Sequence, residues 1–252
     1  MSEVETEKYT VNSLVRGLEI LKLFNEETPT LSLLEISKSL GVSRTVPYRF
    51  LHTLQSMGYL DQDESTKRYS LTPKVLELGF AYLNSLKLPE IAQPYIEKLR
   101  DELDTSCHLS ILDGPEVVYI GTAPVRHVSV VNVNIGTRLP AQSLANGRVL
   151  LAFQPRERLI EKFAANQEIN SSSFQKELEK IRKQGYAITE GDFLPGVRSA
   201  AAPIFDHTGS VKAALNVVAT EALLPEKLLI EEALPKVLEV SAKLSEYLGY
   251  KK

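Results

Sequence analysis

Residues 32–57 limit the possible folds of this chain more than any other stretch, because they carry the start and stop signals of a short helix. Ser32 followed by Glu35 is a capping box, which predicts a helix beginning at Leu33. Gly41 suits the left-handed position that commonly follows a helix, so the helix should end at the preceding residue. The pattern therefore predicts a helix of about two turns with both ends defined.

A second helix should follow directly. Ser43 or Thr45 can cap it. With Thr45 as the cap, Pro47 takes the second helical position and loses no hydrogen bond, because the first N–H groups of a helix have no intrahelical partner. We therefore expect the regular helix to begin at about Val46. A short helix, a glycine-containing turn and a second amphipathic helix predict a helix-turn-helix over 32–57.

The second helix has two different faces. Its predicted apolar stripe is Val46, Phe50, Leu54 and Met57. The opposite face carries Arg44, Thr45, Tyr48, Arg49 and His52. The whole chain has a net charge of −3, yet residues 36–60 contain no Asp or Glu. Such a locally basic surface can contact phosphate, although an ordinary solvated helix face is the alternative.

A helix over 11–24 and a hairpin over 58–71 complete a winged helix-turn-helix over 11–71, preceded by a disordered acidic arm over 1–10. In such a module the last helix can enter the DNA major groove while the wing contacts the backbone. Acidic residues on the wing weaken that second contact, and a protein-docking winged helix is the alternative. The predicted DNA-contacting residues are Ser43, Arg44, Thr45, Tyr48, Arg49, Lys67, Arg68 and Tyr69.

A linker helix over 72–88 should join this module to a domain over 89–252. Thr72 is its predicted cap and Pro73 its first helical residue. Its apolar stripe, Leu76, Phe80 and Leu83, needs to be covered. A further helix over 89–104 contains Pro94, which predicts a late start or a bend.

From residue 105 the hydrophobic period falls to two, which predicts an α+β domain with a mostly antiparallel sheet. We expect a hairpin around the turn DGPE and a strand in HVSVVNV. Two returning strands lie in VRSAAAPIF and SVKAALNVVAT. The expected helices are SLANGRVLLAF, 155–163, 173–184 and 225–248, the last containing Pro235.

Several classes of function lack the residues they need. One cysteine excludes an internal disulfide and fits a reducing cytoplasm, and no apolar run is long enough to span a membrane. Cys107 and His108 are adjacent on a strand and point to opposite faces, so they make a poor metal pair. We predict neither metal nor cofactor. An enzyme acting on a small acid is the alternative function, but no set of nucleophile, base and orienting residue is evident.

Five segments, in order, resemble the IclR family of bacterial transcriptional regulators: VNSLVRGLEILKLF, GVSRTVPYRFLHTLQSMGYL, RYSLTPKVLELG, RLPAQSLANGRVLLAF and GVRSAAAPIFDHTGSVKAALNV. The resemblance covers about residues 11–248. Within the family, VNVNIGTRLPA resembles the branch that regulates aromatic acid catabolism through the β-ketoadipate route. Pro47 departs from the family, whose members usually carry a small or β-branched residue there.

The resemblance implies a ligand-responsive regulator that binds double-stranded operator DNA as a dimer or tetramer. Its C-terminal domain would be GAF-like and bind a small-molecule effector, a carboxylate, between the sheet and the helix in LANGRVLL. The positions carried over from the family are Ala145, Asn146, Val197, Ser199, Asn216 and Val218. Asn216 is a polar residue in an apolar run, so it either lines the pocket or forms a hydrogen bond within the core.

Basic residues of this domain have structural alternatives. Arg198 is better explained by an ion pair with Glu190 or Asp192 than by a contact with the ligand. Arg126 and Arg138 could attract an acidic effector, or they could be solvated loop residues.

Overall fold

The computed structural model describes residues 10–125, 133–155, 159, 163 and 166–251. The chain divides into two compact units, residues 1–85 and 86–252. Three predicted segments fall almost entirely outside the described residues: the acidic arm, the strand over 127–133 and the helix over 155–163. Arg126 also lies outside them.

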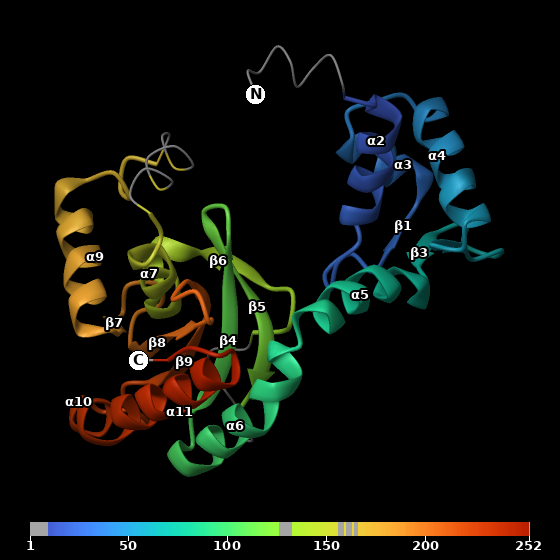
Figure 1. Ribbon diagram of the computed structural model, residues 1–252. Coiled ribbons are helices and arrows are strands. Elements are labelled where there is room, and N and C mark those ends of the chain that lie inside the picture. Colours follow the sequence, from blue (N-terminus) through green and yellow to red (C-terminus); the bar gives the residue numbers. More distant parts are fainter. Residues whose placement is uncertain (1–9, 126–132, 156–158, 160–162, 164–165, 252) are drawn as a thin grey trace. The chain divides into compact units, whose positions relative to one another are not determined.

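The first unit is a winged helix-turn-helix (Figure 1). Its helices are α2 (Asn12–Lys22), α3 (Leu33–Ser39) and α4 (Thr45–Ser56). An antiparallel sheet of order β1-β3-β2 forms the wing side, from β1 (Thr30–Leu31), β2 (Leu60–Gln62) and β3 (Tyr69–Leu71). The buried core consists of Ile20, Phe24, Leu31, Ile36, Leu51, Leu60 and Tyr69. The predicted module is confirmed, with β1 as an unpredicted third strand.

The predicted limits of α3 are confirmed. Ser32 Oγ accepts a hydrogen bond from the Glu35 backbone N–H at 3.3 Å, and a Glu35 carboxylate oxygen accepts one from the Ser32 backbone N–H at 2.7 Å. These two bonds form the capping box. Gly41 has φ +63°, the left-handed conformation expected after the helix.

The start of α4 differs from the prediction. The helix begins at Thr45 after Arg44, and neither predicted cap acts, because the hydroxyls of Ser43 and Thr45 contact each other at 3.0 Å. Pro47 is therefore the third helical residue, where a backbone N–H would still have no intrahelical partner. Its ring is buried. The structural consequence is a rotated apolar face rather than a broken helix.

The predicted apolar stripe of α4 is confirmed only in part, because Phe50 and Leu54 pack against the core while the residues at its two ends do not. Pro47 and Leu51 are the buried residues, and Met57 is exposed. The prediction used Pro47 only as a breaker of backbone hydrogen bonds, whereas its ring is an apolar group that packs like any other. The face that packs on the core therefore contains Pro47 and Leu51 together with Phe50 and Leu54.

The segment after the wing is divided. A 3-10 turn, η1 (Pro73–Val75), begins after Thr72, whose hydroxyl accepts a hydrogen bond from the Lys74 backbone N–H at 3.2 Å. Helix α5 (Leu76–Leu86) follows, and Lys87, with φ +54°, separates it from α6 (Leu88–Leu103). Helix α6 begins at Leu88 and contains Pro94, so of the two expected effects of this proline the late start is wrong and the bend stays a prediction.

The second unit contains a six-stranded antiparallel sheet of order β6-β5-β4-β9-β8-β7. Its central strands are β4 (Ser106–Asp113), β5 (Glu116–Ala123), β8 (Val197–Phe205) and β9 (Val211–Thr220), all of which were predicted. The edge strands β6 (Arg138–Pro140) and β7 (Ala187–Glu190) were not predicted. The α+β architecture with an antiparallel sheet is confirmed.

Helices cover both faces of this sheet (Figure 1). Helix α6 packs on β4 and β5, and α11 (Leu234–Tyr247) packs mainly on β8. On the other face lies α7 (Ala145–Ala152), preceded by the 3-10 turn η2 (Ala141–Ser143), and α9 (Ser172–Gln184) packs on α7. The space between the sheet and the start of α7 is where the resemblance implied a pocket.

The predicted helix over 225–248 is interrupted. It consists of α10 (Glu226–Leu228), a π-helical turn η3 (Leu229–Ala233) and α11. Pro235 lies in the first turn of α11. Proline lacks an N–H and its ring clashes with the carbonyl four residues earlier, so a change of helical pitch before it is expected.

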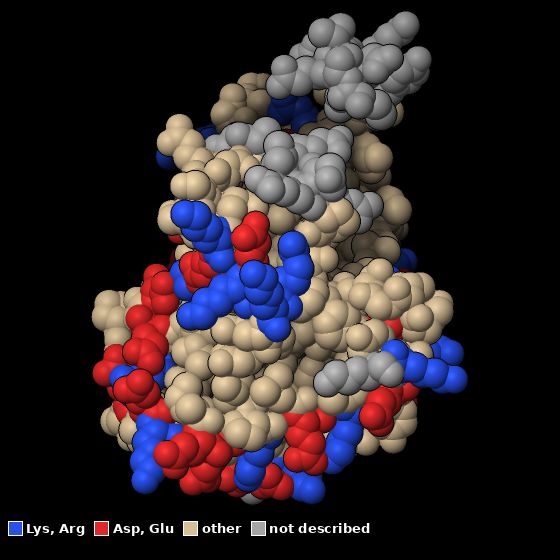
Figure 2. Space-filling view, turned by 60° about the vertical axis from the view of Figure 1, so that its left-hand side comes forward, with Lys and Arg blue, Asp and Glu red and all other residues tan. Residues whose placement is uncertain are grey.

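The charged surface is mixed rather than of one sign. In Figure 2, acidic and basic side chains alternate along the lower part of the face in view, around an uncharged area. None of the helices in the described ranges is long and apolar enough to cross a membrane.

Candidate DNA interface and effector pocket

The outer face of α4 presents the predicted DNA-contacting residues to solvent. Ser43, Arg44, Thr45, Tyr48 and Arg49 are all exposed. No acidic residue lies on this helix, and no side chain caps its first turn. The Val46 N–H donates to the Ser43 carbonyl at 3.1 Å and Pro47 has no N–H, so few free N–H groups remain at this end. The positive end of the helix dipole and the two arginine side chains are what favour a phosphate here.

The wing exposes fewer side chains for contact with DNA than the sequence predicted. Lys67 is exposed in the turn, with φ +55°. Arg68 binds a Glu35 carboxylate oxygen at 3.0 Å and donates to the hydroxyl and the carbonyl of Thr30, both at 2.9 Å. Tyr69 is only 5% exposed and belongs to the core, where burial raises its pKa. Of the three predicted wing contacts, Lys67 alone is exposed.

An acidic residue shapes the tip of the wing. The Asp63 carboxylate accepts hydrogen bonds from the hydroxyl and backbone N–H groups of Ser65 and Thr66. These bonds, with the Ser65 hydroxyl as the largest cause, hold the pKa of Asp63 well below its usual value. The charge of Asp63 is therefore used to fix the turn that carries Lys67.

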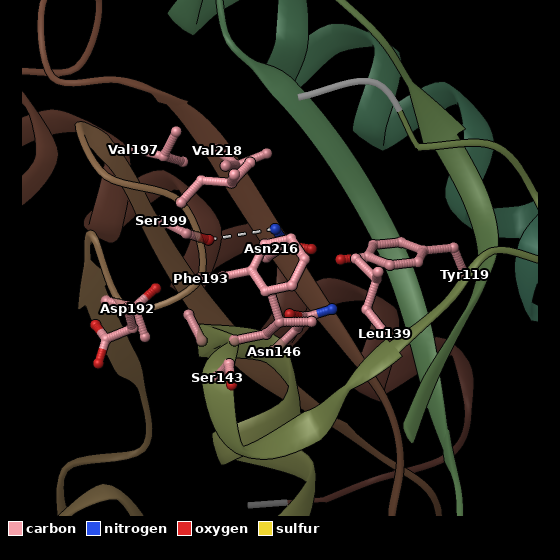
Figure 3. Close-up of a pocket in the computed structure, with 14 residues that line it drawn as sticks. Tyr119, Leu139, Ser143, Asn146, Asp192, Phe193, Val197, Ser199, Asn216 and Val218 are labelled. Carbon is pink, nitrogen blue, oxygen red and sulfur yellow. Dashed lines mark hydrogen bonds between the residues drawn. The ribbon is translucent and has the colours of Figure 1, made fainter. Parts of the chain in front are cut away.

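All six residues carried over from the family line one pocket in the second unit (Figure 3). They are Ala145, Asn146, Val197, Ser199, Asn216 and Val218. The lining residues that the sequence did not indicate are Tyr119, Leu139, Ser143, Leu144, Thr189, Asp192, Phe193 and Leu194. The pocket is small, with a cavity volume of about 40 Å³.

Asn216 both lines the pocket and forms a hydrogen bond within the core, the two roles that the sequence left open. Its amide nitrogen donates to Ser199 Oγ at 3.3 Å, and Ser199 Oγ donates to the Val217 carbonyl at 2.8 Å. The amide oxygen of Asn216 is buried and has no hydrogen-bond partner among the described residues. One half of the amide therefore belongs to the core, and the other half lacks a partner at the pocket.

The start of α7 is held tightly against η2. A Cβ at Gly147 would lie 2.0 Å from the Ala141 carbonyl oxygen, so only glycine fits there. This close approach positions Asn146, which is buried and donates from its amide nitrogen to Ser110 Oγ of β4 at 2.8 Å. Asn146 thus ties the N-terminus of α7 to the sheet at the edge of the pocket.

His108 is a polar group beside the pocket whose role the sequence did not indicate. It lies directly opposite Asn216 in the β4–β9 register, and its ring meets that of Tyr119 edge-on at 5.4 Å. Burial lowers its pKa to about 4, so it is neutral near pH 7. Neither ring nitrogen has a partner among the described residues. Its spacing of two from Ser110 could have placed it on the pocket face.

The loop between β7 and β8 forms one wall of the pocket. It carries Phe193, and it begins and ends at Gly191 and Gly196, whose φ angles are +76° and +73°. Asp192 binds Arg148 of α7 at 2.7 Å. The loop is therefore tied to α7 by one ion pair and bounded by two residues that tolerate left-handed backbone.

Basic residues elsewhere in this unit form ion pairs. Arg198 lies 3.5 Å from Glu190, which confirms the predicted structural pair. Arg138 binds Asp113 and Glu116 at 2.8 Å each. Among the described residues that line the pocket, none is Lys or Arg.

A winged helix-turn-helix in one unit, followed by an α+β unit with a small pocket, is an arrangement typical of DNA-binding transcriptional regulators. Residues 13–64 match the IclR helix-turn-helix domain, and residues 80–246 match the bacterial transcriptional regulator IclR C-terminal domain. The chain belongs to the IclR family of bacterial transcriptional regulators.

Named relatives agree with this assignment. The Pca regulon regulatory protein of Pseudomonas putida is 35% identical over 243 residues, which cover 93% of this chain and 83% of the relative. The p-hydroxybenzoate hydroxylase transcriptional activator of Acinetobacter baylyi is 30% identical over 246 residues, which cover 92% of this chain and 90% of the relative. A crystal structure from Rhodococcus sp. RHA1 is 33% identical with a TM-score of 0.82, covering 95% and 99%. The protein is thus a DNA-binding transcriptional regulator rather than an enzyme.

Proposed function

We propose that α4 enters the major groove of operator DNA and that Ser43, Arg44, Thr45, Tyr48 and Arg49 contact phosphates and base edges. The observation that carries this proposal is the exposed, acid-free outer face of α4 with its uncapped N-terminus. Lys67 is the wing residue available for a backbone contact. Arg68 and Tyr69 are left out, because the former is engaged by Glu35 and the latter is buried.

The DNA-binding form is a homodimer or a tetramer built from dimers. Helix α2 exposes Leu14, Val15 and Leu18, and α5 exposes Leu76, Leu78, Phe80 and Tyr82. These apolar side chains belong to one unit of the chain, and a second copy is the occupant that two-fold symmetry supplies. The operator then has inverted half-sites.

The effector is a small aromatic carboxylate. The regulator binds it in the cytoplasm, where bacterial operator DNA lies. Two relatives are named for the Pca regulon and for p-hydroxybenzoate hydroxylase, which supports an aromatic acid. The uncapped start of α7, with the backbone N–H groups of Ala145 and Asn146 beside the pocket, suits a carboxylate. The effector acts through its different affinities for two forms of the regulator, with a coupling of about 1–3 kcal/mol.

Binding requires the pocket to enlarge. Its present volume of about 40 Å³ has room for about three water molecules, whereas a cavity that holds benzene is on the order of 150 Å³. Phe193, which is 41% exposed and lies on the loop between the two glycines, is the side chain best placed to move.

The test of DNA recognition is operator binding by Arg49→Ala. If Arg49 contacts a base, the affinity for DNA from upstream of the protein's own gene should fall by roughly 5- to 150-fold in gel-shift titrations. Lys176→Ala, an exposed residue of α9 in the other unit, is the control and should bind as the wild type does. Unchanged affinity in both Arg44→Ala and Arg49→Ala contradicts the proposed interface.

A further inference from the structure

We propose that Thr72 is a positioning residue that fixes the direction of α5 relative to α4, and thereby the spacing between the two half-sites that the protein binds. The inference rests on the proposed function, in which α4 reads a half-site and a second copy of the chain covers α5. It goes further because it assigns the geometry of the operator to one hydroxyl group between these two helices.

Helix α5 is held at its start rather than along its length. None of its residues with a described side chain is buried, and no helix or strand in the described ranges packs extensively on it. Within the first unit, such a helix takes its direction from the residues that lead into it. These are the 3-10 turn η1 and Thr72, which precedes that turn.

The end of α4 is closed by two backbone hydrogen bonds. The Gly58 N–H donates to the Gln55 carbonyl, and the Tyr59 N–H donates to the Leu54 carbonyl, both at 2.9 Å. Gly58 has φ +78°, the left-handed conformation that commonly ends a helix. The carbonyl groups of Gly58 and Tyr59 are therefore fixed relative to α4.

Thr72 binds both of these carbonyl groups. Its backbone N–H donates to the Tyr59 carbonyl at 3.0 Å, and its hydroxyl donates to the Gly58 carbonyl at 2.5 Å. The same hydroxyl oxygen accepts a hydrogen bond from the Lys74 backbone N–H at 3.2 Å, at the start of η1. One side-chain oxygen thus joins the end of α4 to the beginning of the turn that leads into α5.

The other contacts of this junction hold it less firmly. The backbone bond from Thr72 to Tyr59 is a single bond about which η1 can still turn. Lys74 Nζ lies 5.5 Å from the centre of the Tyr59 ring, but Lys74 is exposed and its side chain is flexible. Loss of the Thr72 hydroxyl should therefore loosen the direction of α5.

The direction of α5 determines how far apart a dimer holds its two α4 helices, because a second copy covers α5. Each base pair added between half-sites moves one of them by about 3.4 Å along the DNA and turns it by about 35°. A rigid junction accepts one spacing, whereas a loose junction accepts several.

The test is the spacing preference of operator binding. Footprinting on DNA from upstream of the protein's own gene identifies the half-sites. Gel-shift titrations then use duplexes with the natural spacing, with one or two base pairs added or removed, and with one half-site alone. Wild-type protein should lose roughly tenfold or more in affinity when the spacing changes by two base pairs.

Thr72→Val keeps the shape of the side chain and removes the hydroxyl. This variant should bind the natural spacing roughly five- to tenfold more weakly, discriminate against the altered spacings by about threefold or less, and bind one half-site as the wild type does. Thr72→Ser keeps the hydroxyl and should restore the wild-type profile. Thr28→Val is the matched control, because it removes a hydroxyl that donates to the Leu23 carbonyl at 2.9 Å in the same unit, outside the junction.

The outcomes separate this inference from the proposed function. An unchanged spacing profile in Thr72→Val, or the same change in Thr72→Ser or Thr28→Val, overturns the inference and leaves the proposed operator in place. An equal loss of affinity for one half-site and for the whole operator also overturns it, because the hydroxyl would then only stabilise the DNA-binding unit. If wild-type protein binds every spacing equally well, or protects a single half-site, the inverted operator fails and the inference fails with it.

Discussion

At the scale of single residues, His108 is a buried ionisable group whose ring nitrogens have no hydrogen-bond partner among the described residues. It is 1% exposed, and burial lowers its pKa from 6.5 to about 4. In the unfolded chain the same side chain should titrate near its ordinary pKa of about 6.5. Between these two values the unfolded state binds a proton that the folded state does not. Stability is therefore greatest above the unfolded pKa and falls as the pH decreases toward 4.

This difference predicts a pH-dependent loss of stability. On going from about pH 7.5 to about pH 5, His108 should lower the free energy of unfolding by about 2 kcal/mol. His108→Leu removes the titrating group, so its free energy of unfolding should fall by about 2 kcal/mol less over the same range. Urea unfolding followed by circular dichroism measures both proteins, and other titrating groups cancel in the comparison. An equal fall in the two proteins would show that His108 titrates normally.

At the scale of elements, the sequence predicted those whose periodicity is long enough to show. Helices α6 and α9 and the four central strands of the larger sheet were predicted in this way, whereas the short helix α3 was predicted from its capping box and from Gly41. Strands β1, β6 and β7 have two to four residues, so no period appears, and they exist because a distant strand pairs with them. Pro47 was considered only for its effect on backbone hydrogen bonds, so the prediction missed that its apolar ring is buried in the core-facing side of α4.

The pocket could be predicted only in part for a similar reason. Residues in the regular elements, such as Ser199 and Asn216, follow from strand alternation together with the family resemblance. Phe193 and Asp192 lie on a loop, where no period exists and the path depends on two left-handed glycines and on an ion pair with Arg148. Contacts of this kind form only once the fold is complete.

The loop from Gly191 to Gly196 should control access to the pocket. Asp192→Asn keeps the side-chain shape but removes the charge that binds Arg148 at 2.7 Å. Since that arginine is 12% exposed at its side chain, losing the pair should release the loop and raise effector association and dissociation rates on the order of tenfold.

Stopped-flow fluorescence with the aromatic carboxylate that binds most tightly measures these two rates. Glu190→Gln is the matched control, because Glu190 ends the strand before the loop and pairs with Arg198 of β8, so the change leaves the link between Asp192 and α7 intact. If Asp192→Asn binds and releases the ligand at wild-type rates, the loop does not limit entry.

At the scale of the whole molecule, the exposed apolar residues of the DNA-binding unit decide how many copies act together. Leu18 of α2 is 49% exposed and Phe80 of α5 is 54% exposed, although both lie in apolar stripes of amphipathic helices. Such stripes are normally buried against another surface. A second copy of the chain would bury them and would present two copies of α4 to two half-sites.

Charged substitutions in these stripes should therefore separate the copies. We expect wild-type protein to sediment as a dimer or tetramer at micromolar concentration, and the double variant Leu18→Glu, Phe80→Glu to sediment as a monomer. Leu223→Glu, an exposed apolar residue in the other unit, should keep the wild-type state. Because a monomer holds only one half-site, the double variant should also lose most of its operator affinity, even though α4 is unchanged. A wild-type monomer that binds a single half-site tightly would contradict both the assembly and the inverted operator that follows from it.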